Sequence, residues 1–313
     1  MSKNMKAKAD RFKGNDNFSE GRLIREDEIH YSGGLKMIYL NCEVKSGLGE
    51  DTFWTWFQRE FPKCSFEIPN SLNQEDMLLR YSTLGFLPID GKQTALCWEL
   101  YPQMKKVFHC AQWDDRIAKI YEAAQYCTYR TVATEASITD YSKFGSVEVI
   151  PIGVNTDLFK PLKHKSELRS KYNLPLNKKI GIWIGTNHPM KGYSELLRYS
   201  SLNKDIYFIV IWKWKMEASA MQGASNFVKI SQSQICELIN SADFFLSTSK
   251  LSPFYMAEWE AMACDIPFEF FGNEHREFIP SKHPRDDVFD LNWDRASVKK
   301  KWENFFDERG VKW

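Results

Sequence analysis

Short apolar runs alternate with amphipathic segments along most of the chain. Residues 35–44 (LKMIYLNCEV) form an apolar run typical of a strand buried on both faces, and 45–61 carry Gly47 and Gly49 and then an amphipathic stretch, which predicts a glycine turn and a helix. Further strands are predicted at 63–68, 94–100 and 126–134, and a helix at 113–125. This alternation predicts a first open parallel sheet.

A second alternating series follows residues 146–161 (SVEVIPIGVNTDLFKP), a strand and then a loop containing proline and glycine, which is typical of a crossing between domains. Strands are predicted at 178–185, 205–214, 227–231 and 243–249, and helices at 192–202, 233–242 and from 252. Two such series predict an α/β fold with two Rossmann-like domains whose parallel sheets face a cleft. Sheets of this kind bind ligands at the carboxyl ends of their strands.

The two ends of the chain differ from this pattern. Residues 1–34 are charged, lack apolar periodicity and end in two glycines, which predicts a flexible or peripherally docked leader. Its basic start fits either a solvated tail or a segment that binds nucleic acid or acidic lipid. Residues 292–313 predict an amphipathic helix. Its apolar side is expected to hold Trp293, Val298, Trp302, Phe305 and Phe306.

Composition narrows the class of protein. A chain of 313 residues is long enough for two domains, and a net charge of +1 favours neither nucleic acid nor an anionic membrane as partner. The seven cysteines lack zinc-ligand or redox spacing, so we expect reduced, buried thiols. Without an apolar run of membrane-spanning length or a signal peptide, we expect a soluble, cytoplasmic protein with no transmembrane segment.

One apolar stretch, residues 252–267 (SPFYMAEWEAMACDIP), carries two carboxylates, Glu258 and Glu260. A carboxylate on a buried helix needs a partner, because an unpaired buried charge is costly. Ser252 and Pro253 fit a helix N-cap and first turn, and capping alone would explain both residues.

Four segments of the second half, in order and spacing, resemble the retaining GT-B glycosyltransferases of family 4, the group related to glycogen synthase. They are residues 149–161 (VIPIGVNTDLFKP), 184–192 (IGTNHPMKG), 236–249 (CELINSADFFLSTS) and 252–267. The resemblance covers about residues 145–280. Over residues 35–145 it is topological and rests on the glycine loop at Gly47.

The resemblance implies a donor site. Glu260 is similar to the family's second glutamate, which holds the ribose hydroxyls of a sugar nucleotide, and Lys191 to its diphosphate-binding lysine. The start of the helix offers backbone N–H groups to a diphosphate or to sugar hydroxyls. The residues placed there are Phe254, Tyr255 and Met256. Glu258 is expected to point elsewhere and to be exposed.

Two positions depart from the family pattern. Ser252 stands eight residues before Glu260, where the family has its first glutamate, and Thr186, after Gly185, replaces a diphosphate-binding arginine. Lys250, Lys213 and Lys215 are candidates for the lost charge.

The first half carries the candidate acceptor residues. The family's histidine is not evident there, and the corresponding strand ends at Trp98 and Glu99, with His109 beyond it. Glu99 and His109, with Lys191, are the candidate catalytic residues, while Gly47 serves either a phosphate or only a tight turn.

The resemblance implies transfer of a hexosyl or pentosyl group from a nucleotide-diphosphate sugar to an acceptor hydroxyl, with retention of configuration. The donor half has no Asp-x-Asp motif, so we expect no metal, and no cofactor beyond the sugar nucleotide. The sequence leaves two classes of acceptor open: a saccharide or other glycan, and a polymer such as modified DNA. A catalytically degenerate GT-B protein that binds without turnover is the alternative.

The resemblance also divides the chain. It implies an acceptor domain over 35–150, a donor-binding domain over 151–285, and a C-terminal helix over 286–313 that crosses back to the first domain.

Overall fold

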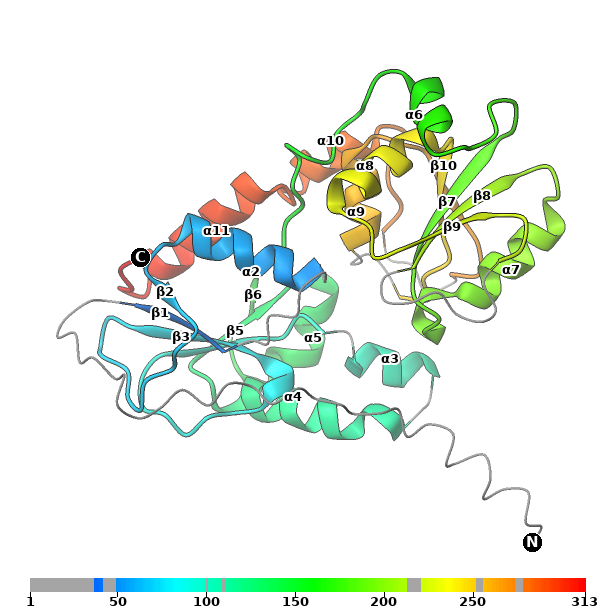
Figure 1. Ribbon diagram of the computed structural model, residues 1–313. Coiled ribbons are helices and arrows are strands. Elements are labelled where there is room, and N and C mark those ends of the chain that lie inside the picture. The colour runs from blue at the N-terminus through cyan, green and yellow to red at the C-terminus, as the bar shows by residue number, and fades with distance from the viewer. Residues whose placement is uncertain are drawn as a thin grey trace, which may run out of the picture. The chain divides into compact units, whose positions relative to one another are not determined.

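A computed structural model places the chain in two parallel sheets with helices around them (Figure 1). It describes residues 37–41, 49–99, 101–108, 111–212, 221–251, 256–273 and 278–313. The α/β class and the two Rossmann-like sheets predicted from the sequence are confirmed.

The first sheet has six strands in the order β2-β1-β3-β4-β5-β6, and neighbouring strands are parallel. The strands are β1 (Ile38–Asn41), β2 (Cys64–Ser65), β3 (Met77–Tyr81), β4 (Gln93–Leu96), β5 (Tyr129–Val132) and β6 (Glu148–Val149). The second sheet has five strands in the order β11-β10-β7-β8-β9, also parallel. These are β7 (Ile180–Gly185), β8 (Tyr207–Trp212), β9 (Ser225–Val228), β10 (Phe244–Ser247) and β11 (Phe268–Phe270).

The described α-helices connect and cover these strands. They are α2 (Gly49–Glu60), α3 (Tyr101–Phe108), α4 (Asp114–Tyr126), α5 (Ile138–Tyr141), α6 (Lys165–Lys171), α7 (Tyr193–Leu202), α8 (Gln232–Ser241), α9 (Met256–Ala263), α10 (Pro284–Asp290) and α11 (Arg295–Asp307). Polar caps set two of the starts: Ser231 and Gln234 form a capping box on α8, and the Asp294 carboxylate accepts from the Ser297 N–H at the start of α11.

Strand β3 lies inside the first sheet, although the sequence pattern did not predict it. Asp76, fully buried before β3, accepts hydrogen bonds from the Met37 and Asn73 N–H groups, both at 2.8 Å, and so ties β3 to β1. Arg80, within the strand, is also buried. This charged residue interrupts the apolar run, so the segment lacks the continuous apolar pattern of a strand buried on both faces.

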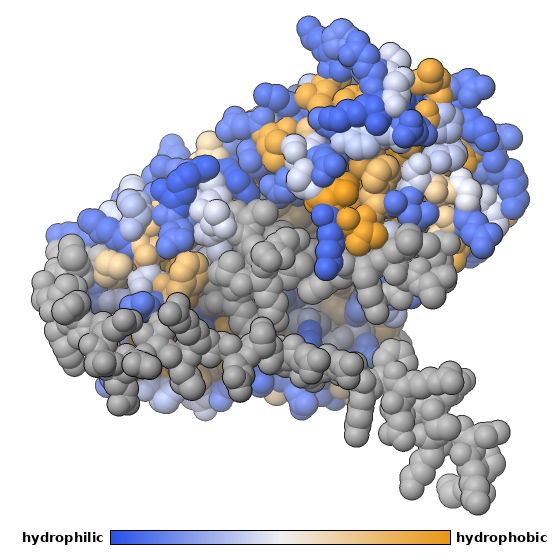
Figure 2. All heavy atoms as spheres, viewed as in Figure 1, coloured by the Kyte–Doolittle hydropathy of each residue, from blue (hydrophilic) through white to orange (hydrophobic). Residues whose placement is uncertain are grey.

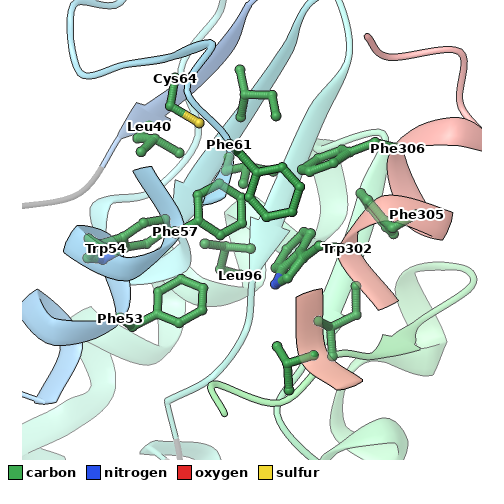
Figure 3. Close-up of a cluster of buried hydrophobic side chains, with 14 of the residues drawn as sticks. Leu40, Phe53, Trp54, Phe57, Phe61, Cys64, Leu96, Trp302, Phe305 and Phe306 are labelled. Carbon is green, nitrogen blue, oxygen red and sulfur yellow. The ribbon is translucent and has the colours of Figure 1, made fainter. Parts of the chain in front are cut away.

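Aromatic side chains fill the core between the first sheet and two helices distant in sequence (Figure 3). Phe57 of α2 meets Trp302 of α11 edge-to-face at 5.4 Å between ring centroids, and Leu96 of β4 belongs to the same cluster. Helix α11 therefore packs against the first sheet, beside α2 in Figure 1. Burial of these rings supplies most of the apolar contact there.

Two crossings of the chain pair with each other between the sheets. The Val154 N–H donates to the Trp293 carbonyl at 2.8 Å, and the Arg295 N–H donates to the Val154 carbonyl at 3.1 Å. Trp293 packs with the core of the second sheet, stacked on Trp259 at 5.1 Å. The prediction that Trp293 shares an apolar side with the α11 residues is therefore wrong, because the helix begins only after this crossing.

Five described cysteines are free and buried, as expected; Cys42 and Cys110 lie outside the described residues. No helix in the described ranges is both long and apolar enough to cross a bilayer. The domain limits predicted from the resemblance are not tested by these observations and stay predictions.

Candidate functional site

The candidate donor residues follow strands that are neighbours in the second sheet. Strands β7, β10 and β11 are parallel, so the loops that follow them emerge at one edge. Thr186 follows β7 directly and is half-buried. Ser252, Phe254 and Tyr255 lie outside the described residues, and Met256 is the first residue of α9.

Thr248, the first residue after β10, joins the β7 loop to the β10 loop. Its hydroxyl accepts from the Trp183 indole N–H at 2.9 Å and donates to the Lys191 carbonyl at 2.8 Å. Two residues on, the Lys250 N–H donates to the Met190 carbonyl at 2.9 Å. These bonds hold the short helix Pro189–Lys191, and with it the backbone of Lys191, against the β10 loop.

Gly192 allows the two loops to approach this closely. Its φ is +66°, and a Cβ atom there would lie 2.0 Å from the Thr248 carbonyl oxygen. The glycine of the Lys-Gly pair that resembles the family motif is thus required by backbone packing, whether or not a ligand binds there. Gly185 has a comparable reason, because a Cβ would lie 2.7 Å from the Trp183 ring.

His188 caps the short helix beside Lys191. Its Nδ1 accepts from the Met190 N–H at 3.2 Å, and its ring lies 5.9 Å from that of Trp113. Burial, and then the charges of Lys191 and Arg116, lower the pKa of His188. The imidazole is therefore held neutral and serves as a cap.

Lys250 is already engaged. Its Nζ lies 2.6 Å from Glu195 Oε1 and 2.9 Å from the Gly272 carbonyl oxygen. It therefore ties the start of α7 to the loop after β11, which does not fit the role of replacing the family's arginine. Lys213 and Lys215 lie outside the described residues.

Helix α9 is largely apolar and buries both of its carboxylates. Glu258 is 2% exposed and Glu260 7% exposed. The prediction that Glu258 is exposed is wrong, because its Oε1 accepts from the Ser247 hydroxyl at 2.5 Å at the end of β10. Figure 2 shows apolar residues gathered where α8 and α9 lie, and these helices carry the partly buried Ile235 and Met256.

Glu260 faces a different environment from Glu258. Two residues apart on a helix, the side chains are separated by about 200° of rotation. Arg295, at the start of α11, has its pKa lowered to about 10 by burial and by the charge of Arg59, and the Glu260 carboxylate opposes this shift. Glu260 therefore lies close enough to Arg295 to stabilise its charge. The guanidinium also lies over the Trp56 ring of α2, 5.4 Å from the centroid.

Two carboxylates, Glu99 and Asp140, lie at the carboxyl side of the first sheet, and each is engaged by a neighbouring side chain. The Tyr81 hydroxyl, at the end of β3, donates to Glu99 Oε1 at 2.5 Å, after β4. Nearby, the buried Asp140 carboxylate accepts from Gln103 and from Lys106, both at 2.5 Å. Gly47 and His109 lie outside the described residues.

No cluster of three or more His, Cys, Asp or Glu side chains that could hold a metal occurs in the part of the chain that the structure describes. That observation does not test whether the reaction needs a metal, so metal independence stays a prediction.

No protein-family model matches the sequence. No curated protein matches it either. Solved structures do. Sucrose-phosphate synthase from Thermosynechococcus elongatus superimposes with a TM-score of 0.57 at 14% identity, over 82% of this chain and 76% of that one.

Two further structures agree over more of their length. Anabaena HepE, solved in complex with UDP-glucose, gives a TM-score of 0.56 at 14% identity, over 88% of this chain and 95% of that one. A glycosyltransferase from Rickettsia africae gives 0.54 at 13% identity, over 88% and 98%. The fold is that of GT-B glycosyltransferases. At these identities the likeness establishes the fold alone.

Sequence reasoning missed Tyr81, Ser247 and Arg295. The available signal for Ser247 was a hydroxyl at the end of an otherwise apolar strand, eleven residues before a glutamate in an apolar helix. Tyr81 and Arg295 had no local signal, since their partners are distant in sequence.

The close contact at Gly192 gives a direct test of the loop geometry. Gly192→Ala should lower the free energy of unfolding by about 1–2 kcal/mol for the left-handed backbone and by about 1–3 kcal/mol more for the clash with Thr248. Gly223→Ala is the matched control, because Gly223 also has a positive φ, +74°, with no atom within 4 Å of an added Cβ. Urea unfolding measures both. Equal losses would show that the two loops do not approach as described.

Proposed function

We propose that the chain is a glycosyltransferase that moves a sugar from a nucleotide-diphosphate sugar to an acceptor hydroxyl. The observation that carries the proposal is the Thr248 junction. It holds the backbone of Lys191 against the loop after β10, which leads into the helix of Glu260. These two segments resemble a sugar-nucleotide site, and both lie at the same edge of the second sheet. The GT-B fold, and the UDP-glucose bound to HepE, support the same reading.

The donor chemistry follows from the charges at this edge. Cleavage of the sugar–phosphate bond leaves a diphosphate that gains negative charge, so fixed positive groups around it contribute most. Lys191 supplies a cation, and the backbone N–H groups at the start of α9 supply aligned dipoles. Glu260 accepts hydrogen bonds from the ribose hydroxyls.

We propose, from the motif resemblance, that the transferred hexosyl or pentosyl group keeps its configuration and that the leaving phosphate takes the acceptor's proton. The same resemblance supports transfer without a metal or a further cofactor. It also supports a donor domain over 151–285, an acceptor domain over 35–150 and a returning helix over 286–313.

The acceptor enters at the first sheet in this proposal. Glu99 is a half-buried carboxylate at that edge and accepts from the Tyr81 hydroxyl, whereas Asp140 is buried and paired with Lys106. A carboxylate such as Glu99 accepts from sugar hydroxyls, whereas a polyanion requires an excess of cations. We therefore favour a saccharide acceptor over DNA.

A second candidate function is binding of a sugar nucleotide or glycan without turnover. Thr186 and Ser252, which stand where the family has an arginine and a glutamate, favour it. Transfer or hydrolysis of any sugar nucleotide would exclude this candidate.

The proposed function predicts that the protein binds and is stabilised by one class of nucleotide-diphosphate sugar. A thermal-shift screen with UDP-, GDP- and ADP-sugars, followed by calorimetry, measures this, and a CMP-sugar serves as a monophosphate control.

Glu260→Gln keeps the side-chain volume but removes the charge, so the parent's best nucleotide should bind about tenfold more weakly, as expected for a charge-assisted bond of about 1.5–3 kcal/mol. Unchanged affinity would contradict the ribose role.

Lys191 is expected to be the main side-chain cation facing the diphosphate. Lys191→Ala should weaken binding of the bare nucleoside diphosphate by about tenfold or more, since a charge-assisted bond contributes about 1.5–3 kcal/mol. Thr186→Arg should strengthen it by a similar factor, because it restores a fork of donors that suits phosphate. Calorimetric titration of both variants with the nucleoside diphosphate measures these affinities. If Lys191→Ala binds it as tightly as the parent does, the diphosphate does not lie beside Lys191.

Glu99 is expected to serve the acceptor rather than the donor. Glu99→Gln should lower the transfer rate by about tenfold or more, since the bond lost to an acceptor hydroxyl is charge-assisted, and should leave nucleotide affinity unchanged. Tyr81→Phe is the companion variant, because it removes the 2.5 Å donor to Glu99 but leaves the carboxylate. Steady-state kinetics measures the transfer rate of each variant, and calorimetry measures its affinity for the nucleotide. If the affinity falls together with the rate, Glu99 does not serve the acceptor alone.

A further inference from the structure

The Ser247–Glu258 hydrogen bond lies where the candidate donor loops meet. Ser247 is the last residue of β10 and is 1% exposed, and its hydroxyl donates to the buried Glu258 carboxylate of α9 at 2.5 Å. A hydrogen bond to a carboxylate is short and directional, so it fixes both side chains. It therefore links the end of the strand directly to the helix that carries Glu260.

The same serine also holds the loop after β11. Its carbonyl accepts from the Phe271 N–H at 3.1 Å and from the Asn273 side-chain amide at 3.2 Å. The amide also lies 3.4 Å from the Ser247 hydroxyl oxygen. Ser247 thus joins three elements, β10, α9 and the β11 loop.

Thr248 follows Ser247 and holds the β7 loop through Lys191. Two adjacent residues therefore set the relative positions of the loops after β7, β10 and β11 and of the helix α9. Since Glu258 and Glu260 are on one rigid helix, fixing Glu258 against Ser247 also fixes the direction in which Glu260 points.

We propose that Ser247 and Glu258 are a positioning pair for the donor site. The bond holds α9 in the rotation that presents Glu260 to the ribose while Thr248 holds Lys191 for the diphosphate. This inference rests on the proposed function, and it assigns to Glu258 a role in binding although its carboxylate does not contact the ligand. A site held to within fractions of an ångström requires such supporting bonds.

The test separates positioning from stability. Ser247→Ala removes the bond. Ser241→Ala is the matched control, because Ser241 is also fully buried in the second domain and donates to the Leu238 carbonyl at 2.7 Å, but it lies before β10, at the opposite end of that strand. Glu258→Gln keeps the volume and a carbonyl acceptor for the Ser247 hydroxyl. Binding of the nucleoside diphosphate that the parent prefers is measured by calorimetry, and the unfolding midpoint by urea.

We expect Ser247→Ala to bind about tenfold more weakly than the parent, or about 1.4 kcal/mol. Glu258→Gln should stay within about threefold, since the hydroxyl keeps an acceptor. Ser241→Ala should lower the unfolding midpoint less than Ser247→Ala does, because its hydrogen bond is neutral, and should leave the affinity unchanged.

Each outcome decides between the hypotheses. Equal affinity of parent and Ser247→Ala overturns the positioning pair and leaves the proposed function intact. Failure of the parent to bind any nucleoside diphosphate overturns the proposed function, and the pair with it. If Ser247→Ala does not fold, Ser247→Cys replaces it, because a thiol is a much weaker donor to Glu258 than the hydroxyl. A loss of affinity of about threefold is then expected, and no loss overturns the inference.

Discussion

The hydroxyl of Thr248 is the constraint on which the candidate site depends. A hydroxyl has one donor and two acceptor positions. Here it accepts from the Trp183 indole in the middle of β7 and donates to the Lys191 carbonyl. Thr248, which follows the neighbouring strand β10, therefore connects the loop after β7 to the Trp183 side chain of β7 itself. Because the Thr248 carbonyl packs directly on Gly192, neither loop can shift without moving the other.

The two acids of α9 follow from the same arrangement. An apolar helix in this position needs polar groups only where it meets the edge of the sheet. Glu258 meets Ser247 inside the protein, whereas Glu260 lies towards Arg295. Between them in sequence, Trp259 stacks on Trp293 in the crossing segment. The Trp259–Trp293 stack and the Ser247–Glu258 hydrogen bond therefore both hold this helix in place.

The repeating pattern of apolar runs was sufficient to predict most strands and the fold class, because strands buried on both faces are apolar throughout. It failed at β3, where Arg80 is buried among apolar neighbours, and at Trp293, where periodicity continues across a break between α10 and α11. It also failed at Glu258. The only sequence signal for its burial was the hydroxyl of Ser247 at the end of an apolar strand, and the pairing of the two residues is seen only in the tertiary structure. Roles carried by Gly47, His109 and the start of the α9 segment lie outside the described residues and stay predictions.

Charge divides the described site residues in a way that fits transfer of a glycosyl group. The edge of the second sheet carries Lys191, and the edge of the first carries Glu99. A departing diphosphate gains negative charge, while an acceptor hydroxyl donates its hydrogen, so the two substrates need opposite electrostatic environments. The weak point of this arrangement is Thr186, which supplies no charge where the family that the motifs resemble has an arginine. In the proposed function, a diphosphate without this arginine depends more on Lys191 and on the loop geometry that the Thr248 and Ser247 hydrogen bonds fix, so disturbing either bond should weaken binding more than it would in a site with both cations.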